Sequence, residues 1–99
     1  MKSPNDCRSL EEVRSEIDRL DEQIVSLLGR RALYVQAAAR FKTSPADVAA
    51  PQRLAAMLEI RRQWAAREGL DPDFVEHLFR EMVAHFVSRE LEHWKRGSL

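Results

Sequence analysis

Arg31 interrupts an otherwise regular apolar pattern in the first half of the chain. Apolar residues recur there at steps of three and four, at Leu10, Val13, Ile17, Leu20, Ile24, Leu27, Tyr34, Ala38 and Phe41. That spacing is typical of one face of an amphipathic helix, and it calls for an apolar residue at position 31. Because an unpaired guanidinium is costly to bury, Arg31 needs an anion, either a neighbouring carboxylate or a bound ligand.

Three further charged residues interrupt apolar surfaces or lie close to one. Lys42 follows Arg31 by eleven residues, which on a continuous helix returns to within about 20° of the same face. Arg53 and Glu90 each share a helical face with apolar residues. Together these residues predict a pocket between helices that binds a small dicarboxylate or a phosphate. Their spacing alone names no reaction.

Arg14 cannot serve the same ligand as Arg31 on a straight helix. The seventeen residues between them correspond to about 100° around the helix axis and ~25 Å along it. If Arg14 serves a site of this kind, that site is therefore the equivalent one of a partner chain.

Each of these residues also has a purely structural interpretation. Arg14 could pair with Asp18 or be solvated, and Glu90 could pair with Lys95 or Arg96 of a neighbouring helix. The arginine on the apolar stripe could form an ion pair across a dimer interface. The residues alone leave both interpretations open.

Other site chemistries find little support in the chain. His77, His85 and His93 lie eight residues apart, so no pair has the i, i+4 spacing of a helical zinc site, and we expect them at the surface. Cys7 is the only cysteine, which excludes a disulfide within one chain and a thiolate cluster. We find no glycine-rich phosphate loop, no Ser/His/Asp set and no dinucleotide fingerprint.

Composition predicts one small helical domain. The 99 residues are 44% hydrophobic and 32% charged, with only three glycines and four prolines. Sixteen basic residues balance sixteen acidic ones, so net charge gives no argument for nucleic acid or an anionic membrane as partner. No apolar segment resembles a secretion signal or a membrane span, and we expect a cytoplasmic protein.

The apolar stripe predicts one helix from about Leu10 to about Lys42, after a short leader over residues 1–8 and with Ser9 as N-cap. Such a helix is roughly 50 Å long, about twice the ~26 Å diameter of a compact 100-residue domain. The rest of the chain cannot cover it. We therefore expect a second copy to do so, in a dimer or higher oligomer.

Proline and glycine mark the remaining boundaries. Thr43 to Pro51 is a break that contains a short turn at Ser44-Pro45. A second helix should run from about 51 to 67 and close at Gly69, and Asp71-Pro72 should open a third that ends near 96. The prediction is a single all-α domain over residues 1–99, with three helices in a bundle.

Essentially the whole chain resembles the all-helical chorismate mutase family. The resemblance is carried by the run VRSEIDRLDEQIVSLLGRRALYVQAAARFK, then by APQR and by LDPDFVEHLF. More narrowly, the opening MKSPNDC and the stretch GRR-x-x-YV-x-AA-x-RFK are similar to the isochorismate pyruvate lyase branch, which forms salicylate.

This resemblance implies an intertwined homodimer with two equivalent sites. Each site takes Arg14 from the first helix of the other chain, while Arg31, Lys42 and Arg53 of the same chain hold the two carboxylates and the ether region of the substrate. Glu90 matches the late site residue of the family. The resemblance implies no metal and no organic cofactor.

The substrates so implied, isochorismate and chorismate, each carry two carboxylates and an enolpyruvyl ether. Their reactions are pericyclic and need no nucleophile. The enzyme must hold a compact conformer and stabilise charge on the ether oxygen as its C–O bond breaks. Lys42, a point cation, is suited to the ether oxygen, and the arginines are suited to the carboxylates.

Two residues depart from the family pattern. Leu54 stands where mutases commonly place a glutamate for the ring hydroxyl, which favours the lyase reaction over conversion of chorismate to prephenate. Glu90 stands where the lyase branch usually has glutamine. Ionised, it would repel a dianion, so we expect activity to fall as pH rises and Glu90→Gln to relieve this fall. A non-catalytic helical dimer is the remaining alternative, which the retained cations disfavour.

Overall fold

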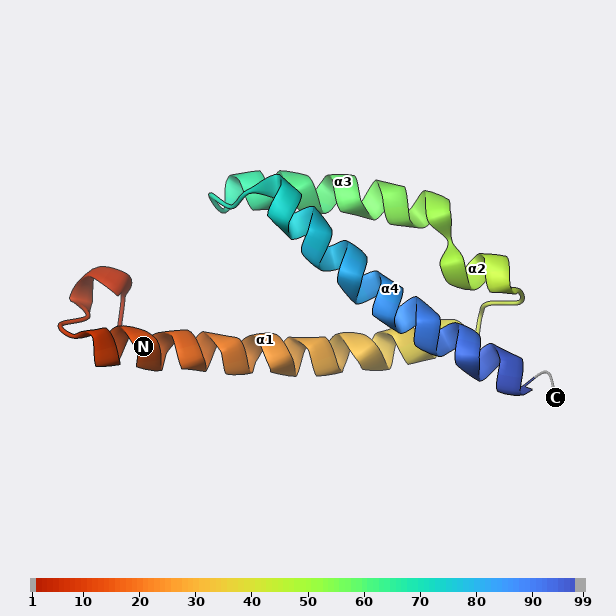
Figure 1. The fold of residues 1–99 in the computed structure, drawn as a ribbon, viewed down its shortest axis with the longest axis horizontal. Helices are drawn as coiled ribbons and strands as arrows, with labels where there is room; N and C mark the ends of the chain where they lie inside the picture. The colour runs from red at the N-terminus through yellow and green to blue at the C-terminus, as the bar shows by residue number, and fades with distance from the viewer. Residues whose placement is uncertain (1, 98–99) are drawn as a thin grey trace. The chain divides into compact units, whose positions relative to one another are not determined.

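The computed structural model describes residues 2–97, and the side chains of residues 2–95. A short 3-10 helix, Pro4–Asp6, precedes four α-helices: α1 (Leu10–Ala39), α2 (Pro45–Ala49), α3 (Pro51–Arg67) and α4 (Pro72–Gly97) (Figure 1). The all-α prediction with one very long N-terminal helix is confirmed, and α2 is the predicted short turn at Ser44-Pro45. No helix in this described part is both long and apolar enough to span a membrane.

Helix α1 begins where the sequence predicts. Ser9 accepts a hydrogen bond at Oγ from the Glu12 amide, 3.1 Å away, as an N-cap does. The Glu12 carboxylate accepts in turn from the Arg8 amide at 2.6 Å and from Lys2 Nζ at 2.8 Å. These bonds lower the pKa of Glu12, the Lys2 bond most. The leader is thereby tied to the first turn of the helix.

The end of α1 corrects the expected boundary. The helix stops at Ala39 rather than near Lys42, and the amides of the next three residues each bond to the carbonyl three residues earlier. Ser44 is extended (φ −155°, ψ 161°), as a residue before proline prefers, so α1 cannot continue through Ser44 into α2. Lys42 therefore lies in the loop after α1, and the helical rotation that we used to relate it to Arg31 does not apply.

The chain divides into two compact units, residues 1–34 and 35–99, which we describe separately. In the first unit, α1 buries none of its residues. Its predicted apolar stripe is exposed at every position there, namely Leu10, Val13, Ile17, Leu20, Ile24, Leu27 and Tyr34. A stripe of this length is unusual on the surface of a monomeric protein.

In the second unit, α3 and α4 form an antiparallel hairpin and α2 packs against α4 (Figure 1). The buried side chains come from all three helices and are Val48, Met57, Leu58, Ala65 and Val75. At the turn, Gly69 adopts φ +74° and the Leu70 amide donates to the Ala65 carbonyl at 2.8 Å. This is the glycine-closed helix end that the sequence predicts.

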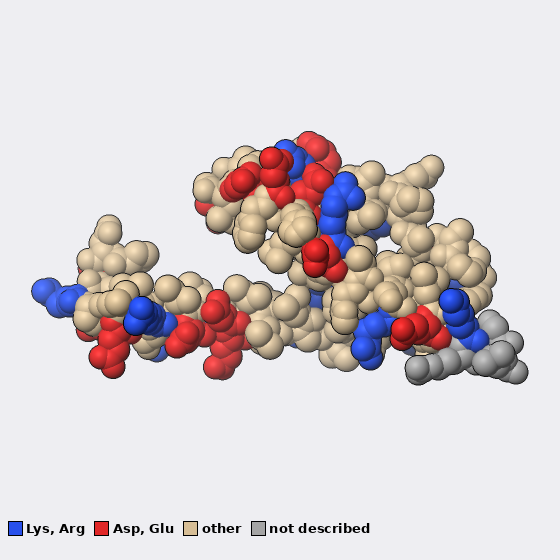
Figure 2. Space-filling model, viewed as in Figure 1, with Lys and Arg blue, Asp and Glu red and all other residues tan. Residues whose placement is uncertain are grey.

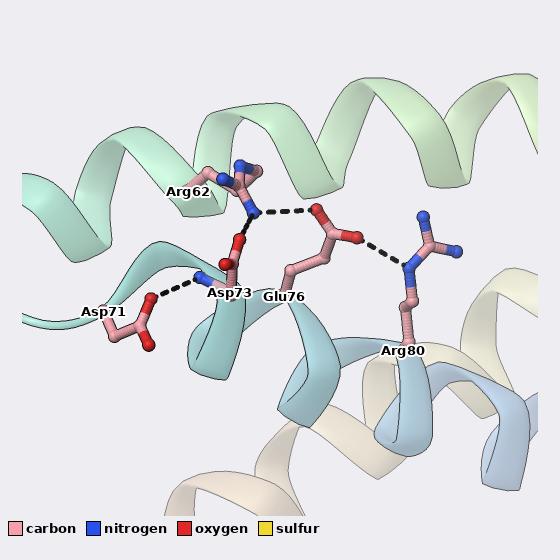
Figure 3. Close-up of polar contacts among 5 residues, drawn as sticks. All are labelled: Arg62, Asp71, Asp73, Glu76 and Arg80. Atoms are coloured by element: carbon pink, nitrogen blue, oxygen red, sulfur yellow. Dashed lines mark hydrogen bonds and ion pairs between the residues drawn. The ribbon is translucent and has the colours of Figure 1, made fainter.

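Charged side chains join α3 to α4 near this turn. Nη1 of Arg62 lies 2.8 Å from Asp73 and 3.1 Å from Glu76, and Nε of Arg80 lies 2.9 Å from the other Glu76 oxygen (Figure 3). Acidic and basic side chains accordingly lie beside one another at this end of the hairpin (Figure 2). The bonds from Arg80 and then Arg62 lower the pKa of Glu76. The network fixes the start of α4 against α3.

A second contact between these helices is aromatic. The guanidinium of Arg61 lies 4.8 Å from the ring centroid of Trp64 and 5.4 Å from that of Phe79 on α4. Both distances are within the range of a cation–π interaction. Arg61 and Arg62 thus hold α4 by different means from adjacent positions of α3.

Candidate active site

Lys42 and Glu90, two of the predicted site residues, form an ion pair. Nζ of Lys42 lies 2.9 Å from Oε2 of Glu90, although the residues are 48 positions apart in the sequence. Only 24% of the Lys42 side chain and 12% of the Glu90 side chain are exposed. The partly buried setting strengthens this charge-assisted bond relative to one in water.

The two residues reach each other from different elements. Glu90 lies on α4, and Lys42 lies in the loop between α1 and α2. The Lys42 amide bonds to the Ala39 carbonyl at 3.2 Å, which fixes its backbone to the last turn of α1. After Lys42 the chain enters α2, whose Val48 is buried (5% exposed) in the second unit. The lysine backbone is thus held on both sides.

Arg53 lies in the first turn of α3, where Pro51 opens the helix. Its side chain is exposed, and it has no ion pair with any residue whose side chain the structure describes. The residue before this helix, Ala50, has a left-handed backbone (φ 39°) and is at once the C-cap of α2 and the N-cap of α3. Leu54, at the position discussed above, is half-buried.

Arg14 and Arg31 both lie on α1, within the first unit. Arg14 is exposed, and the suggested ion pair with Asp18 is not among those of the described residues. Arg31 is half-buried. Because α1 is continuous between them, the ~25 Å separation along one helix holds, and one small ligand cannot touch both from the same chain.

Glu90 pairs with a residue that was not among its suggested partners. We considered Lys95 or Arg96; the structure gives Lys42 instead, and the Arg96 side chain lies outside the described residues. Sequence spacing could not find this pair, because it forms between a loop and a helix. The three histidines are exposed, as expected, and His77 lies 3.6 Å from Glu81.

The sequence analysis singled out Ser44-Pro45 within residues 43–51 but missed Thr43 and Asp47. The Asp47 amide donates to Ser44 Oγ at 3.3 Å, and Asp47 Oδ2 accepts two bonds from Thr43. The signal that could have found them is the capping pattern, a serine followed three residues later by an acid.

This arrangement offers cation and acid chemistry rather than nucleophilic chemistry. Lys42 can donate to an oxygen that gains negative charge, and Glu90 can hold or release one proton beside it. No group of three or more His, Cys, Asp or Glu side chains among the described residues could hold a metal ion.

Comparison with known proteins places this geometry in context. The profile of the family described as chorismate mutase type II matches residues 13–91. The chain is 47% identical over 96 residues to the isochorismate pyruvate lyase of Pseudomonas aeruginosa. The aligned region covers 97% of this chain and 95% of that protein. It is also 31% identical over 83 residues to the T-protein of Haemophilus influenzae, covering 83% of this chain but 22% of the T-protein.

Proposed function

Because the chain belongs to the chorismate mutase type II family, we propose that it is an isochorismate pyruvate lyase. The observation that carries this proposal is the similarity to the Pseudomonas aeruginosa enzyme of that name, which extends over nearly the full length of both chains. The half-buried Lys42–Glu90 pair supports it, because it brings together a cation and an acid that the family resemblance implies as site residues.

In the proposed reaction, the ether C–O bond of isochorismate breaks while a ring hydrogen moves to the methylene carbon of the enolpyruvyl group. Pyruvate leaves and the ring becomes aromatic, as salicylate. No group on the protein is consumed and no outside oxidant is needed. The enzyme's task is to hold the reactive conformer and to stabilise charge on the ether oxygen.

We assign the ether oxygen to Lys42. Its ammonium lies 2.9 Å from a carboxylate and is mostly shielded from water, so it is ordered and desolvated on that side. A preorganised donor of this kind needs little rearrangement when charge develops during the reaction. Arg31 and Arg53 would hold the two carboxylates of the substrate, as the family resemblance implies.

Glu90 has two effects in this proposal. Its carboxylate orders the Lys42 ammonium through their ion pair. As an anion it also competes with the substrate for that cation, which an uncharged glutamine in its place would not do.

The active form is proposed to be a homodimer in which Arg14 of each chain enters the site of the other. The exposed apolar stripe of α1 supports this assembly, because a 30-residue helix that buries nothing within its own chain requires another surface to cover it. A partner copy of α1 supplies a matching apolar surface and brings in an arginine from another chain.

Conversion of chorismate to prephenate is the second candidate activity. The family description and the similarity to the T-protein favour it. Leu54 disfavours it, because an aliphatic side chain cannot bind the ring hydroxyl that a glutamate would bind. We expect isochorismate to be the better substrate and prephenate formation to be weak.

Parallel assays test the proposed function. The purified protein is incubated with isochorismate, with salicylate fluorescence as readout, and with chorismate, with loss of its absorbance as readout. Rapid salicylate release with slow chorismate loss is the expected result. Faster turnover of chorismate would make the protein a mutase. No turnover and no binding of either compound would identify a non-catalytic helical dimer.

A further inference from the structure

We propose that Asp47 is a positioning residue that sets the place of the Lys42 ammonium by holding the backbone immediately after it. The proposal rests on the role assigned above to Lys42. The family resemblance does not name Asp47. Its role follows from hydrogen bonds in the loop between α1 and α2 and at the start of α2.

The Asp47 carboxylate holds Thr43 at two atoms. Oδ2 of Asp47 accepts from the Thr43 amide at 2.9 Å and from Thr43 Oγ1 at 2.8 Å. These bonds, the backbone one first, lower the pKa of Asp47, so the carboxylate is ionised while it makes them. A charged acceptor gives stronger bonds than a neutral one. Thr43 is therefore fixed at the residue that directly follows Lys42.

We call the two bonds from Thr43 to Asp47 the clasp; its Asp47 side is itself fixed in the fold. Asp47 lies within α2, whose first turn is capped by Ser44 and whose Val48 is buried. α2 packs against α4, the helix that carries Glu90. A short series of contacts thus connects the helix bearing the acid to the backbone bearing the cation: α4, α2, the Asp47 carboxylate, and then Thr43.

The clasp matters because Lys42 has no helix of its own. α1 ends at Ala39, and α2 begins at Pro45, so the lysine lies in a five-residue connection. Its own amide is bonded to Ala39 and the following amide to Asp47. Without the second bond, the backbone can rotate after Lys42, and the long lysine side chain would convert a small rotation into a displacement of its ammonium.

The variant Asp47→Ala tests this proposal in the intact protein. We expect kcat for the lyase reaction to fall about tenfold while KM changes less than about threefold, because the lysine acts on charge that develops in the transition state. Asp47→Asn keeps an oxygen acceptor and should restore most of the lost turnover. A loss of kcat that comes with a larger change in KM, and that Asp47→Asn does not rescue, would overturn the proposal.

Asp71→Ala is the matched control. Asp71 accepts at Oδ1 from the Asp73 amide, 2.9 Å away, at the start of α4, so this substitution removes a similar capping bond far along the chain from Lys42. It should lower thermal stability without lowering kcat. An equal loss of kcat in both variants would show that Asp47 acts only through stability, and would overturn the proposal.

A double-mutant cycle separates positioning from a general effect. If Asp47 acts through Lys42, then Asp47→Ala should cause no further loss of kcat in a Lys42→Ala background. An unchanged tenfold loss in that background would overturn the proposal. Full turnover of Lys42→Ala alone would instead overturn the proposed function of the lysine, so the two failures are distinguishable.

Thr43→Val covers the case in which Asp47→Ala does not fold. Valine keeps the shape of threonine and leaves the backbone bond to Asp47 in place, but it removes the hydroxyl bond. We expect a loss of kcat of about threefold, again absent in the Lys42→Ala background. Turnover equal to that of the unmodified protein would contradict the clasp.

Discussion

Lys42 and Glu90 lie with Nζ and Oε2 2.9 Å apart and largely shielded from water, so the cation and the acid are held as a pair. A lone ammonium there would attract any small anion, and a lone carboxylate would repel the substrate. The pair keeps both groups ordered until a ligand with a suitable oxygen competes for the lysine.

Lys42→Ala should lower kcat for isochorismate cleavage by about 10²–10³, the usual effect of removing one preorganised donor to a developing charge. Steady-state salicylate release measures it. Lys95→Ala, which removes an exposed lysine from α4, is the control and should leave kcat unchanged. Similar activity of the two variants would exclude Lys42 from the reaction.

Glu90→Gln should raise kcat/KM for isochorismate by about tenfold. The glutamine still accepts from Lys42 but carries no charge, so it does not compete electrostatically with a dianion for the lysine. Steady-state salicylate release measures the change. Glu92→Gln, the same charge change at an exposed position of α4, should alter nothing. Equal kcat/KM for Glu90→Gln and the unmodified protein would refute this account.

Arg14→Ala and Lys42→Ala chains should complement each other if sites are shared between chains. A heterodimer of the two, purified with two different tags, contains one site with both residues intact and one with neither. We expect it to have about half the activity of the unmodified dimer, while each variant alone is nearly inactive.

The matched control pairs Arg31→Ala with Lys42→Ala. Both of these residues are assigned to the same chain's site, so each site of that heterodimer lacks one of them and activity should stay low. Equal recovery in both heterodimers, or recovery in neither, would contradict the proposed exchange of Arg14.

Glu76→Gln should lower the free energy of unfolding near neutral pH. It should also make that free energy depend less on pH in the acid range. Arg80 and Arg62 hold the Glu76 pKa below its ordinary value of 4.5, so the folded protein binds this proton less readily than the unfolded chain. The stabilisation is therefore complete above this ordinary value and is lost as pH falls through the lowered pKa.

The measurement is the urea midpoint of unfolding between pH 3 and about pH 7. The midpoint of Glu76→Gln should be lower at pH 7 and should converge with that of the unmodified protein in acid. Glu59→Gln, an exposed position on α3, serves as control. A constant difference between the two midpoints across the pH range would indicate that the network of Figure 3 contributes nothing through its charge.

Much of the fold could be predicted from local chemistry. Ser9, Pro51, Gly69 and Pro72 mark helix ends by capping and by backbone preference, and each such end is found where the residue predicts. The end of α1 could not be placed, because three consecutive bonds to the carbonyl three residues back terminate it with no glycine or proline at that end. Boundaries of that kind leave no mark in the residue types.

The candidate site was predicted less completely. Charged residues on apolar faces drew attention to Arg31 and Glu90, and one-dimensional spacing was sufficient for that. The spacing put Lys42 on the same helical face as Arg31, but α1 ends at Ala39, three residues before Lys42. The spacing also missed Lys42 as a neighbour of Glu90, because that lysine comes from a loop 48 positions away.

Ala50, which closes α2 and opens α3, leaves no spacer between those helices. A single inserted residue there would change the direction in which α3 leaves α2, because the left-handed backbone of Ala50 alone sets it. A chimaera that exchanges this loop with that of a relative should therefore transfer residues 42–53 as one segment. Piecemeal chimaeras would bring in a join that neither parent possesses.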